Sequence, residues 1–472
     1  MKECAKAYLQ KRGYTVNSNA LSIIQICDDW YSNRIIADFH KRKNLNGMEF
    51  EMSRMNFAKR CCADDANLCE IVSVAPENQS ASKEFISQIL ESNRFEVRYR
   101  EQLEKISATG TAGAYIYLKN ANYLDAGKGN ISVKGGRICI NYVDADCIIP
   151  LTVDNGLVTE CAFCATDVVK GKEKTTLVIF TQEMSLYKAE TVVFNEMGQK
   201  LTEECGSIQL GDVKPFAIMM NAEVNNLDNM MGYGLPKVYN SIPLFKAMDL
   251  CYNILYGDIE KGQKLVFLNE LLACIQKGED GRPYLTPQQK EIFILLGAAG
   301  GKMPEEKVLV QEYNPEIRIE QITKAFELVL SLLSMSFGYG TKKYTFENGK
   351  ITTATEYIGT KQDSMQELNK QRKQAEDYIN DIIHAAMWFS NTFLSTGYDV
   401  EEKLSIEFDD SYITDRESEL ERLRNDAISF DIPQLTIMYL MEAYNMTKQE
   451  ASALVLERQK EEEQNADGDE ED

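Results

Sequence analysis

The chain has 472 residues, 44% hydrophobic and 26% charged, which is enough to bury a sizeable core in roughly two to four structural units. Acidic residues outnumber basic ones by 73 to 51, so the net charge is −22. Affinity for nucleic acid comes from neutralising phosphate groups, so this balance excludes a protein that grips DNA along a broad basic surface. Any DNA contact is expected to be loose, local or repulsive.

Membrane-spanning and secreted proteins are also disfavoured. The most apolar segment, 326–337, carries Glu327 and falls short of the ~20 residues that a spanning helix needs. No apolar run follows the N-terminal residues, so we expect no signal peptide. Twelve cysteines without a secretion signal predict reduced thiols in a reducing compartment.

The first half of the chain is predicted to be helical at first and then rich in strands. Residues 1–105 have the mixed apolar and polar pattern of helices with polar connections. A hairpin is expected within 184–194. Further strands are predicted where β-branched and aromatic runs alternate with Gly, Asn and Asp turns, at 115–118, 137–143, 158–164 and 176–180.

Two amphipathic helices follow, at 241–262 and 319–337. Apolar residues recur at helical spacing in both. Pro243 suits the first turn of the first helix and would kink it at any later position. Between the helices, 263–318 is predicted to be a small module with strands and one short helix.

The longest predicted helix is 353–395, about 60 Å at 1.5 Å per residue. Thr353–Glu356 fits a capping box at its start, and Asn348-Gly349 before it is a hairpin signal. Its first half is mostly polar and its second half apolar, which favours a helix that spans layers of an assembly. A strand at 404–408, helices at 415–430 and 432–460, and an acidic tail at 461–472 complete the chain.

The order of these features resembles that of a known family. The relevant residues are Asp249 and Tyr252, the run Asp258–Gly262, Thr353–Glu356 before the long helix, and Ile406–Asp410 in the late strand. From about residue 57 to 463 the chain resembles the portal proteins of tailed bacteriophages, also called head-to-tail connectors. The branch it resembles is common in long-tailed phages of Gram-positive hosts.

The resemblance implies an α+β fold with a portal-type architecture. A mixed α/β wing, a two-helix stem, a small α/β clip insertion, a tunnel loop, a long helix crossing the ring wall and a helical crown are expected. The implied boundaries are 1–235 for the wing with a return segment 396–430, 236–262 and 319–337 for the stem, 263–318 for the clip, 338–352 for the tunnel loop, 353–395 for the long helix, and 431–472 for the crown and acidic tail.

The function implied is a ring of about twelve copies at one capsid vertex, through which double-stranded DNA is packaged and ejected. The other implied partners are the large terminase subunit, head-completion or adaptor proteins, the scaffold and the major capsid protein, with no membrane, no enzymatic activity, no metal and no cofactor. The protein is expected in the virion, at the portal vertex, after assembly in the cytoplasm of the bacterial host.

Two groups of residues are candidates for contacts in such a ring. In the tunnel loop, a small basic and aromatic cluster could touch phosphates, since a lysine or an aromatic ring can contact passing DNA. It consists of Lys342, Lys343, Tyr344, Phe346 and Lys350. In the clip, charges near a turn could set partner choice, namely Glu279, Asp280 and Arg282.

Two other classes of protein remain open from the residues alone. One is a soluble enzyme in which Cys161 and Cys164 serve as a metal or thiol site, although a zinc site needs four ligands and ordinary buried thiols explain the pair more simply. The other is a capsid-associated helical protein that never closes into a ring. Aspartates could also bind a divalent ion, although strand ends and turns rich in Asp explain them more simply. The candidates are Asp144, Asp146, Asp409 and Asp410. The loop 297–302 lacks the spacing of a phosphate loop.

Overall fold

The computed structural model describes residues 3–43, 47–78, 80–120, 122–125, 131–134, 136–262, 265–269, 293–296, 310–314, 316–341, 343–344, 354–409, 416–430, 432–444, 446 and 451–456. The chain divides into two units. The larger one contains residues 1–67 and 76–404, and the smaller one contains 68–75 and 405–472.

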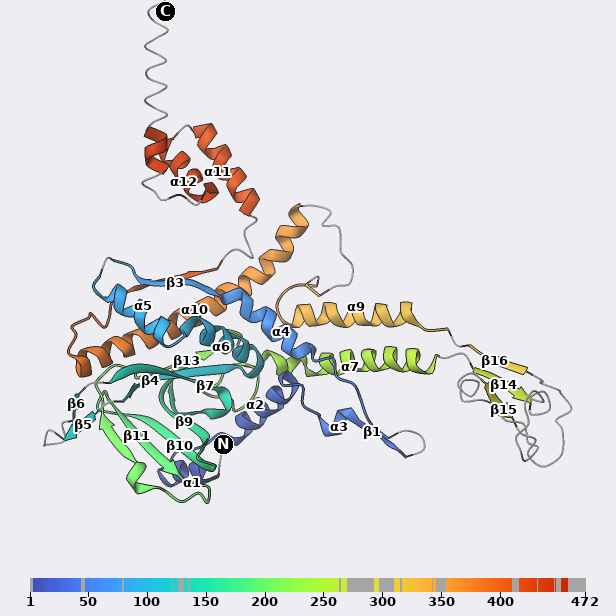
Figure 1. Ribbon diagram of the computed structural model, residues 1–472, viewed down its shortest axis with the longest axis horizontal. Coiled ribbons are helices and arrows are strands. Elements are labelled where there is room, and N and C mark those ends of the chain that lie inside the picture. Colours follow the sequence, from blue (N-terminus) through green and yellow to red (C-terminus); the bar gives the residue numbers. More distant parts are fainter. Residues whose placement is uncertain are drawn as a thin grey trace, which may run out of the picture. The chain divides into compact units, whose positions relative to one another are not determined.

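The larger unit contains most of the helices and strands (Figure 1). It begins with α1 (Glu3–Lys11), α2 (Ser18–Tyr31), α3 (Ala37–His40), β1 (Lys41–Lys43), β2 (Glu49–Glu51), α4 (Phe57–Ala66), α5 (Ser82–Ser92) and α6 (Phe95–Thr109). It continues with β4 (Thr111–Lys119), β5 (Asn122–Asp125), β6 (Ile131–Lys134), β7 (Arg137–Asp144), β8 (Ile148–Asp154), β9 (Leu157–Val169), β10 (Lys172–Glu183), β11 (Leu186–Phe194), β12 (Gly206–Gln209) and β13 (Phe216–Met220). The last elements are α7 (Lys237–Lys261), β14 (Leu265–Asn269), β15 (Phe293–Leu296), β16 (Val310–Tyr313), α9 (Ile319–Ser336) and α10 (Ala354–Leu394).

Two antiparallel sheets form the centre of this unit. One has the order β12-β11-β10-β9-β8 and the other β13-β4-β7. Side chains alternate between the two faces of each strand, so each sheet has one face toward the other sheet and one toward helices. Phe163 and Phe180 of the first sheet meet Phe216 of the second at ring distances of 5.9 and 5.6 Å.

Helices cover the outer faces of both sheets. Helix α1 packs Ala5 and Leu9 against the five-stranded sheet, in a core that includes Leu177 of β10. Helices α6 and α10 lie on β4 of the other sheet (Figure 1), where Ala112 and Ala114 are fully buried. Such small side chains let helices approach the sheet closely.

The smaller unit is built from two distant segments of the chain. Strand β3 (Ile71–Pro76) pairs with β17 (Leu404–Phe408), and helices α11 (Arg416–Phe430) and α12 (Pro433–Tyr444) pack against each other. The strand predicted at 404–408 is confirmed. The helix predicted at 432–460 is not continuous, because α12 ends at Tyr444 and Met446 is not helical. Asn445, a poor helix former, follows the last residue of α12.

Most strands lie where their sequence pattern predicts, but the segment 184–194 does not form a hairpin by itself. It is the second arm, β11, of a hairpin whose first arm is β10. The turn between them places Met184 and Ser185 at φ 48° and 70°. Turns of this kind usually contain Asn or Gly, so these two residues gave no turn signal.

The first of the two amphipathic helices begins earlier than predicted. Helix α7 starts at Lys237, directly after Pro236, and Pro243 lies inside it rather than in its first turn. Ser241 donates a hydrogen bond from its hydroxyl to the carbonyl of Lys237, one turn before. The side chain of Pro243 is exposed, so the helix accommodates this proline on its solvent-facing side.

Candidate functional site

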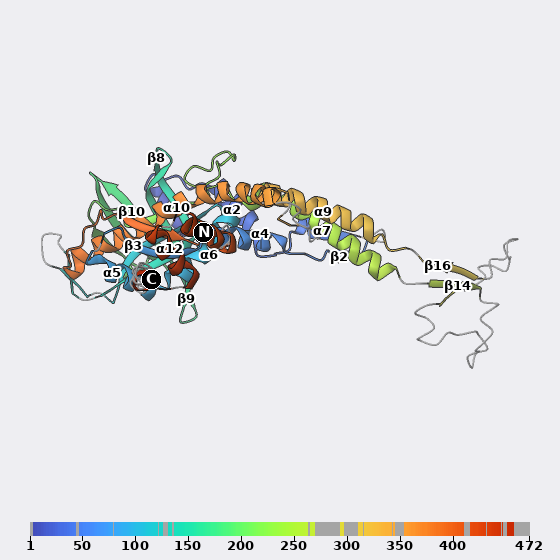
Figure 2. The same ribbon diagram turned by 90° about the horizontal axis from the view of Figure 1, so that it is seen from above.

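Helices α7 and α9 lie side by side in both views (Figures 1 and 2). Near the end of α9, the hydroxyls of Ser241 and Ser336 share a hydrogen bond of 2.7 Å. Near the end of α7, Arg318 donates two hydrogen bonds to Asp258, of 2.7 and 2.9 Å, and these hold the pKa of that carboxyl below its usual range. The two helices are thus tied together at both ends.

A single stripe of side chains runs along α7 and changes its environment on the way. Its members follow one another at spacings of three and four residues: Val238, Ser241, Phe245, Met248, Tyr252, Tyr256 and Ile259. The first half is buried, with Phe245 at 2% exposure. In the second half, Tyr256 is 54% and Ile259 57% exposed. Apolar residues at such spacing share one helix face, so the face that packs in the core continues uncovered beyond it.

Helix α9 has a similar uncovered stripe. Leu328, Leu332 and Met335 are spaced by four and three residues and are 63%, 41% and 56% exposed. Leu333, on the other side of the helix, is fully buried. Since α9 packs against α7 with its buried side, the two helices leave apolar surface open on both. Scattered exposed apolar residues are ordinary, but aligned ones mark an interaction surface.

The segment after α9 enters the protein core before it leaves the described residues. Tyr339 is 1% exposed and donates a hydrogen bond of 2.9 Å from its hydroxyl to Asp65, which also pairs with Lys237 of α7 at 2.9 Å. Burial raises the pKa of Tyr339 well above its usual range. The start of the loop is therefore fixed to α4 and α7 by a buried polar cluster.

The structure places two of the predicted tunnel-loop residues. Tyr344 is 9% exposed, its ring lies 5.2 Å from that of Phe57, and its backbone N–H donates to the Ser334 hydroxyl. The ammonium group of Lys343 lies 5.0 Å from the centre of the Tyr339 ring. Lys342, Phe346 and Lys350 lie outside the described residues, as do Glu279, Asp280, Arg282, the loop 297–302 and Asn348-Gly349.

Cys161 and Cys164 are both buried in strand β9, at 0% and 4% exposure. Residues three apart in a strand point to opposite faces, so the two thiols do not face each other. Cys164 belongs to the core beneath α1, whereas Cys161 pairs with Phe180, whose ring faces the other sheet. Burial raises the pKa of the Cys161 thiol. This arrangement offers no paired thiol site.

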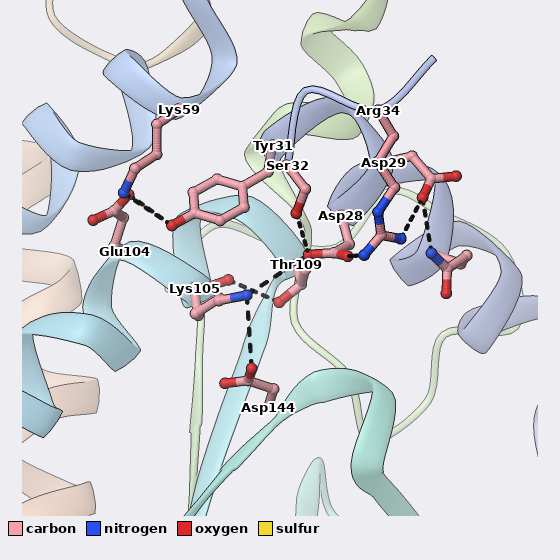
Figure 3. Close-up of polar contacts among 11 residues, drawn as sticks. Asp28, Asp29, Tyr31, Ser32, Arg34, Lys59, Glu104, Lys105, Thr109 and Asp144 are labelled. Carbon is pink, nitrogen blue, oxygen red and sulfur yellow. Dashed lines mark hydrogen bonds and ion pairs between the residues drawn. The ribbon is translucent and has the colours of Figure 1, made fainter. Parts of the chain in front are cut away.

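Of the aspartates considered for a divalent ion, Asp144 lies beside the ammonium group of Lys105 (Figure 3). The ammonium group of Lys105 lies 3.6 Å from both Asp28 and Asp144, and Arg34 pairs with Asp28 at 3.1 Å. Burial raises the pKa of Asp144, against the opposing effect of Lys105. The network borders a cavity of about 760 Å³. Within the described parts of the chain no group of three potential ligands is placed to hold a metal ion, and Asp410 lies outside them.

Several residues that position these elements have no distinct signal in the sequence. Asp65, Lys237 and Asp249 are polar residues in amphipathic helices, where they read as solvent-facing. Asp249 is 4% exposed and Lys237 7% exposed. For Asp249 the available signals are its place among the residues that carry the family resemblance and its position directly after Met248 of the apolar stripe of α7.

Comparison with known proteins gives a family over most of the chain. The family model described as "Phage portal protein, SPP1 Gp6-like" matches residues 64–466. A search of curated proteins returned no match. Among solved structures, a chain from the neck of a native GTA particle, computed with C12 symmetry, is similar with a TM-score of 0.35 and 11% identity. The similarity covers 78% of this chain and 84% of that one. No helix in the described parts of the chain has the length and apolar character to cross a bilayer.

Proposed function

Because the chain belongs to the SPP1 Gp6-like phage portal protein family, we propose that about twelve copies form a closed ring at one vertex of a phage capsid. Double-stranded DNA passes through this ring during packaging and ejection. The ring is assembled in the cytoplasm of the bacterial host and remains in the virion as the head-tail connector. It acts as a structural channel and docking platform, without catalysis of its own.

The observation that best supports the ring is the apolar stripe of α7, which continues from the buried core onto the exposed part of the helix. Burying a fully exposed Leu or Ile contributes about 1.5–3 kcal/mol, and a partly exposed apolar side chain gains a corresponding fraction when it becomes buried. Tyr252, Tyr256 and Ile259 on α7 can gain this on contact with Leu328 and its neighbours on α9 of the next copy. Two different surfaces that meet head to tail generate a ring when the rotation between copies closes.

The parts of the chain take the roles that the family implies. Residues 1–235 with 396–430 form the wing, and 236–262 with 319–337 form the stem that includes α7 and α9. The clip is 263–318, the tunnel loop 338–352, and the crown with its acidic tail 431–472. Helix 353–395 crosses the ring wall, and the second half of α10 is buried against β13 and β4.

The tunnel loop contributes local contacts to DNA in an otherwise acidic channel. A wall with many phosphate contacts would hold DNA rather than let it slide, and the net charge of −22 suits a weakly binding lumen. Lys342, Lys343 and Lys350 supply its basic points, with Phe346 beside them. Tyr344, which is buried against Phe57, anchors the start of the loop.

Lys342→Ala with Lys343→Ala should leave rings intact and reduce DNA packaging or retention. Normal yields of DNA-filled heads would disprove this role.

The clip provides the docking surface for the large terminase subunit and later for head-completion or adaptor proteins. The scaffold and the major capsid protein contact the ring elsewhere. Glu279, Asp280 and Arg282 lie near a predicted turn, and charges at the rim of an interface set partner choice.

Reversing all three charges should leave rings incorporated in capsid precursors and yield empty heads. Normal DNA content in these particles would show that this turn is not the docking surface, and loss of the ring from particles would assign it to assembly.

The ring itself is tested by placing a charge on the α9 stripe. In the purified protein, Leu332→Asp should reduce the fraction of rings in electron micrographs at least tenfold, because the carboxylate would be buried between copies. Leu157→Asp is the matched control, since it adds the same charge in place of an apolar side chain that is 70% exposed at the turn between β8 and β9, away from both helices. A wild-type protein that stays monomeric at micromolar concentration would overturn the proposed function, and rings of both variants would overturn the assigned interface.

A further inference from the structure

The hairpin of β1 and β2 is displayed on the surface of the larger unit. All six residues of its two strands are exposed. In the part of the chain that the structure describes, its strands pair only with each other, as a two-stranded sheet. An isolated two-stranded hairpin is marginally stable in water, so its position has to be fixed from outside the hairpin.

The two faces of the hairpin differ in character. On one face Lys41 pairs across the strands with Glu51, and Lys43 with Glu49, at 3.3 Å in the second case. On the other face Arg42 lies opposite Phe50, which is 49% exposed. The charges of the first face compensate each other, which disfavours DNA as a partner. An aromatic ring beside an arginine is the combination that dominates many protein interfaces.

The base of the hairpin is clamped to α7. His40, 1% exposed, accepts the backbone N–H of Ile36 at Nδ1, so its proton is on Nε2 and points to Asp249 at 3.2 Å. The other oxygen of Asp249 accepts the N–H of Met55, which lies beyond the second strand. Both strands are therefore held by the same buried carboxylate.

A second clamp lies one turn further along α7. The side-chain amide of Asn253 accepts the N–H of Ser53 at 2.9 Å and donates to its carbonyl at 2.7 Å. At about 100° per residue, Tyr252 and Tyr256 lie within about 60° of Asp249 around the helix. The clamped hairpin therefore adjoins the exposed stripe of α7.

We propose that the Phe50–Arg42 face of the hairpin docks on the α9 stripe of a second copy of this chain, formed by Leu328, Leu332 and Met335. The inference rests on the proposed ring and specifies which elements of adjacent copies meet. The hairpin and the α7 stripe form one side of the contact, and the α9 stripe of the next copy forms the other. The clamped base of the hairpin, the exposed Phe50 ring and the continuity with the uncovered stripe of α7 support this contact.

Photo-crosslinking of the full-length protein tests the contact. A benzophenone amino acid replaces Phe50 in one sample and Leu157 in the control, since Leu157 is 70% exposed at the turn between β8 and β9. Irradiated rings should give a covalent dimer from position 50 at least fivefold more than from position 157. Mass spectrometry should identify the acceptor peptide as the one containing 328–335.

Substitution of Phe50 gives an independent test of the contact, through the fraction of protein in rings. Phe50→Glu should lower the ring fraction at least threefold relative to Leu157→Glu, with unchanged circular dichroism because the side chain is exposed. If rings that carry the benzophenone amino acid at position 50 give no covalent dimer, or a crosslink to DNA or within one copy, the hairpin contact is overturned and the ring still stands. A wild-type protein without rings would instead overturn the proposed function.

Discussion

Asp249 shows how one buried carboxylate organises a region of the fold. It is 4% exposed and accepts from His40 and from the backbone of Met55. Removing one partner from a buried hydrogen bond leaves the other unsatisfied, at about 1–3 kcal/mol for each group. The stability of this region therefore depends on a residue whose type alone suggests a surface position.

Asp249→Ala should lower the free energy of unfolding by about 2–5 kcal/mol, because two donors lose their acceptor inside the protein. Glu101→Ala is the control. It removes an exposed partner of Arg98, and such pairs contribute about 0–1 kcal/mol. Chemical denaturation of both variants under assembly-preventing conditions measures the difference. Equal losses would show that the clamp adds no stability.

The roles of individual residues were only partly predictable. Tyr344 stands in a loop beside lysines, a pattern that predicts DNA contact, yet its ring packs against Phe57, which is 287 positions earlier in the chain. The pairing of Asp65 with Lys237 likewise joins distant helices. Local patterns report which face of an element is apolar, but they do not report which distant polar groups meet there.

At the scale of elements, helices α7, α9 and α10 were predictable because their apolar spacing extends over many turns. The pairing of β3 with β17 was not, since the two strands are separated by more than three hundred residues and have no shared pattern. The start of α7 was also missed. A proline usually marks a first turn, and here Pro243 lies in the interior with an exposed ring.

Pro243→Ala should raise the free energy of unfolding by about 1–2 kcal/mol. Alanine restores a backbone N–H that can donate to the carbonyl of Tyr239, and a helix-interior proline costs about 3 kcal/mol, partly offset by the stiffer unfolded chain. No buried contact is lost, because the ring is exposed. Thermal unfolding of the two proteins measures the change, and a decrease in stability would show that the proline relieves strain.

At the scale of the whole molecule, the fold class and the family were accessible from the order of elements, while the subunit contact was not. The net charge of −22 per copy acts against assembly, because the proposed ring brings copies with like charges together. Apolar stripes on α7 and α9 have to overcome this repulsion. The balance between the two depends on the ionic strength of the solution.

The fraction of rings should therefore rise when salt increases from about 0.1 M to about 1 M, where the screening distance falls from about 10 Å to about 3 Å. Apolar contacts are not weakened by this change, whereas repulsion between copies is. Analytical ultracentrifugation at a fixed protein concentration measures the distribution. Dissociation of rings at high salt would show that ion pairs, rather than apolar stripes, hold the copies together.

The clamp between the β1–β2 hairpin and α7 has a mechanical consequence. Asp249 and Asn253 hold the hairpin on two successive turns of the helix. A rotation of α7 about its axis therefore moves the hairpin together with the helix. In a closed ring built from the proposed contacts, that hairpin contacts the adjacent copy. A displacement of one stem helix by passing DNA is then transmitted from copy to copy around the ring. The force on any single subunit is thereby shared by all of them.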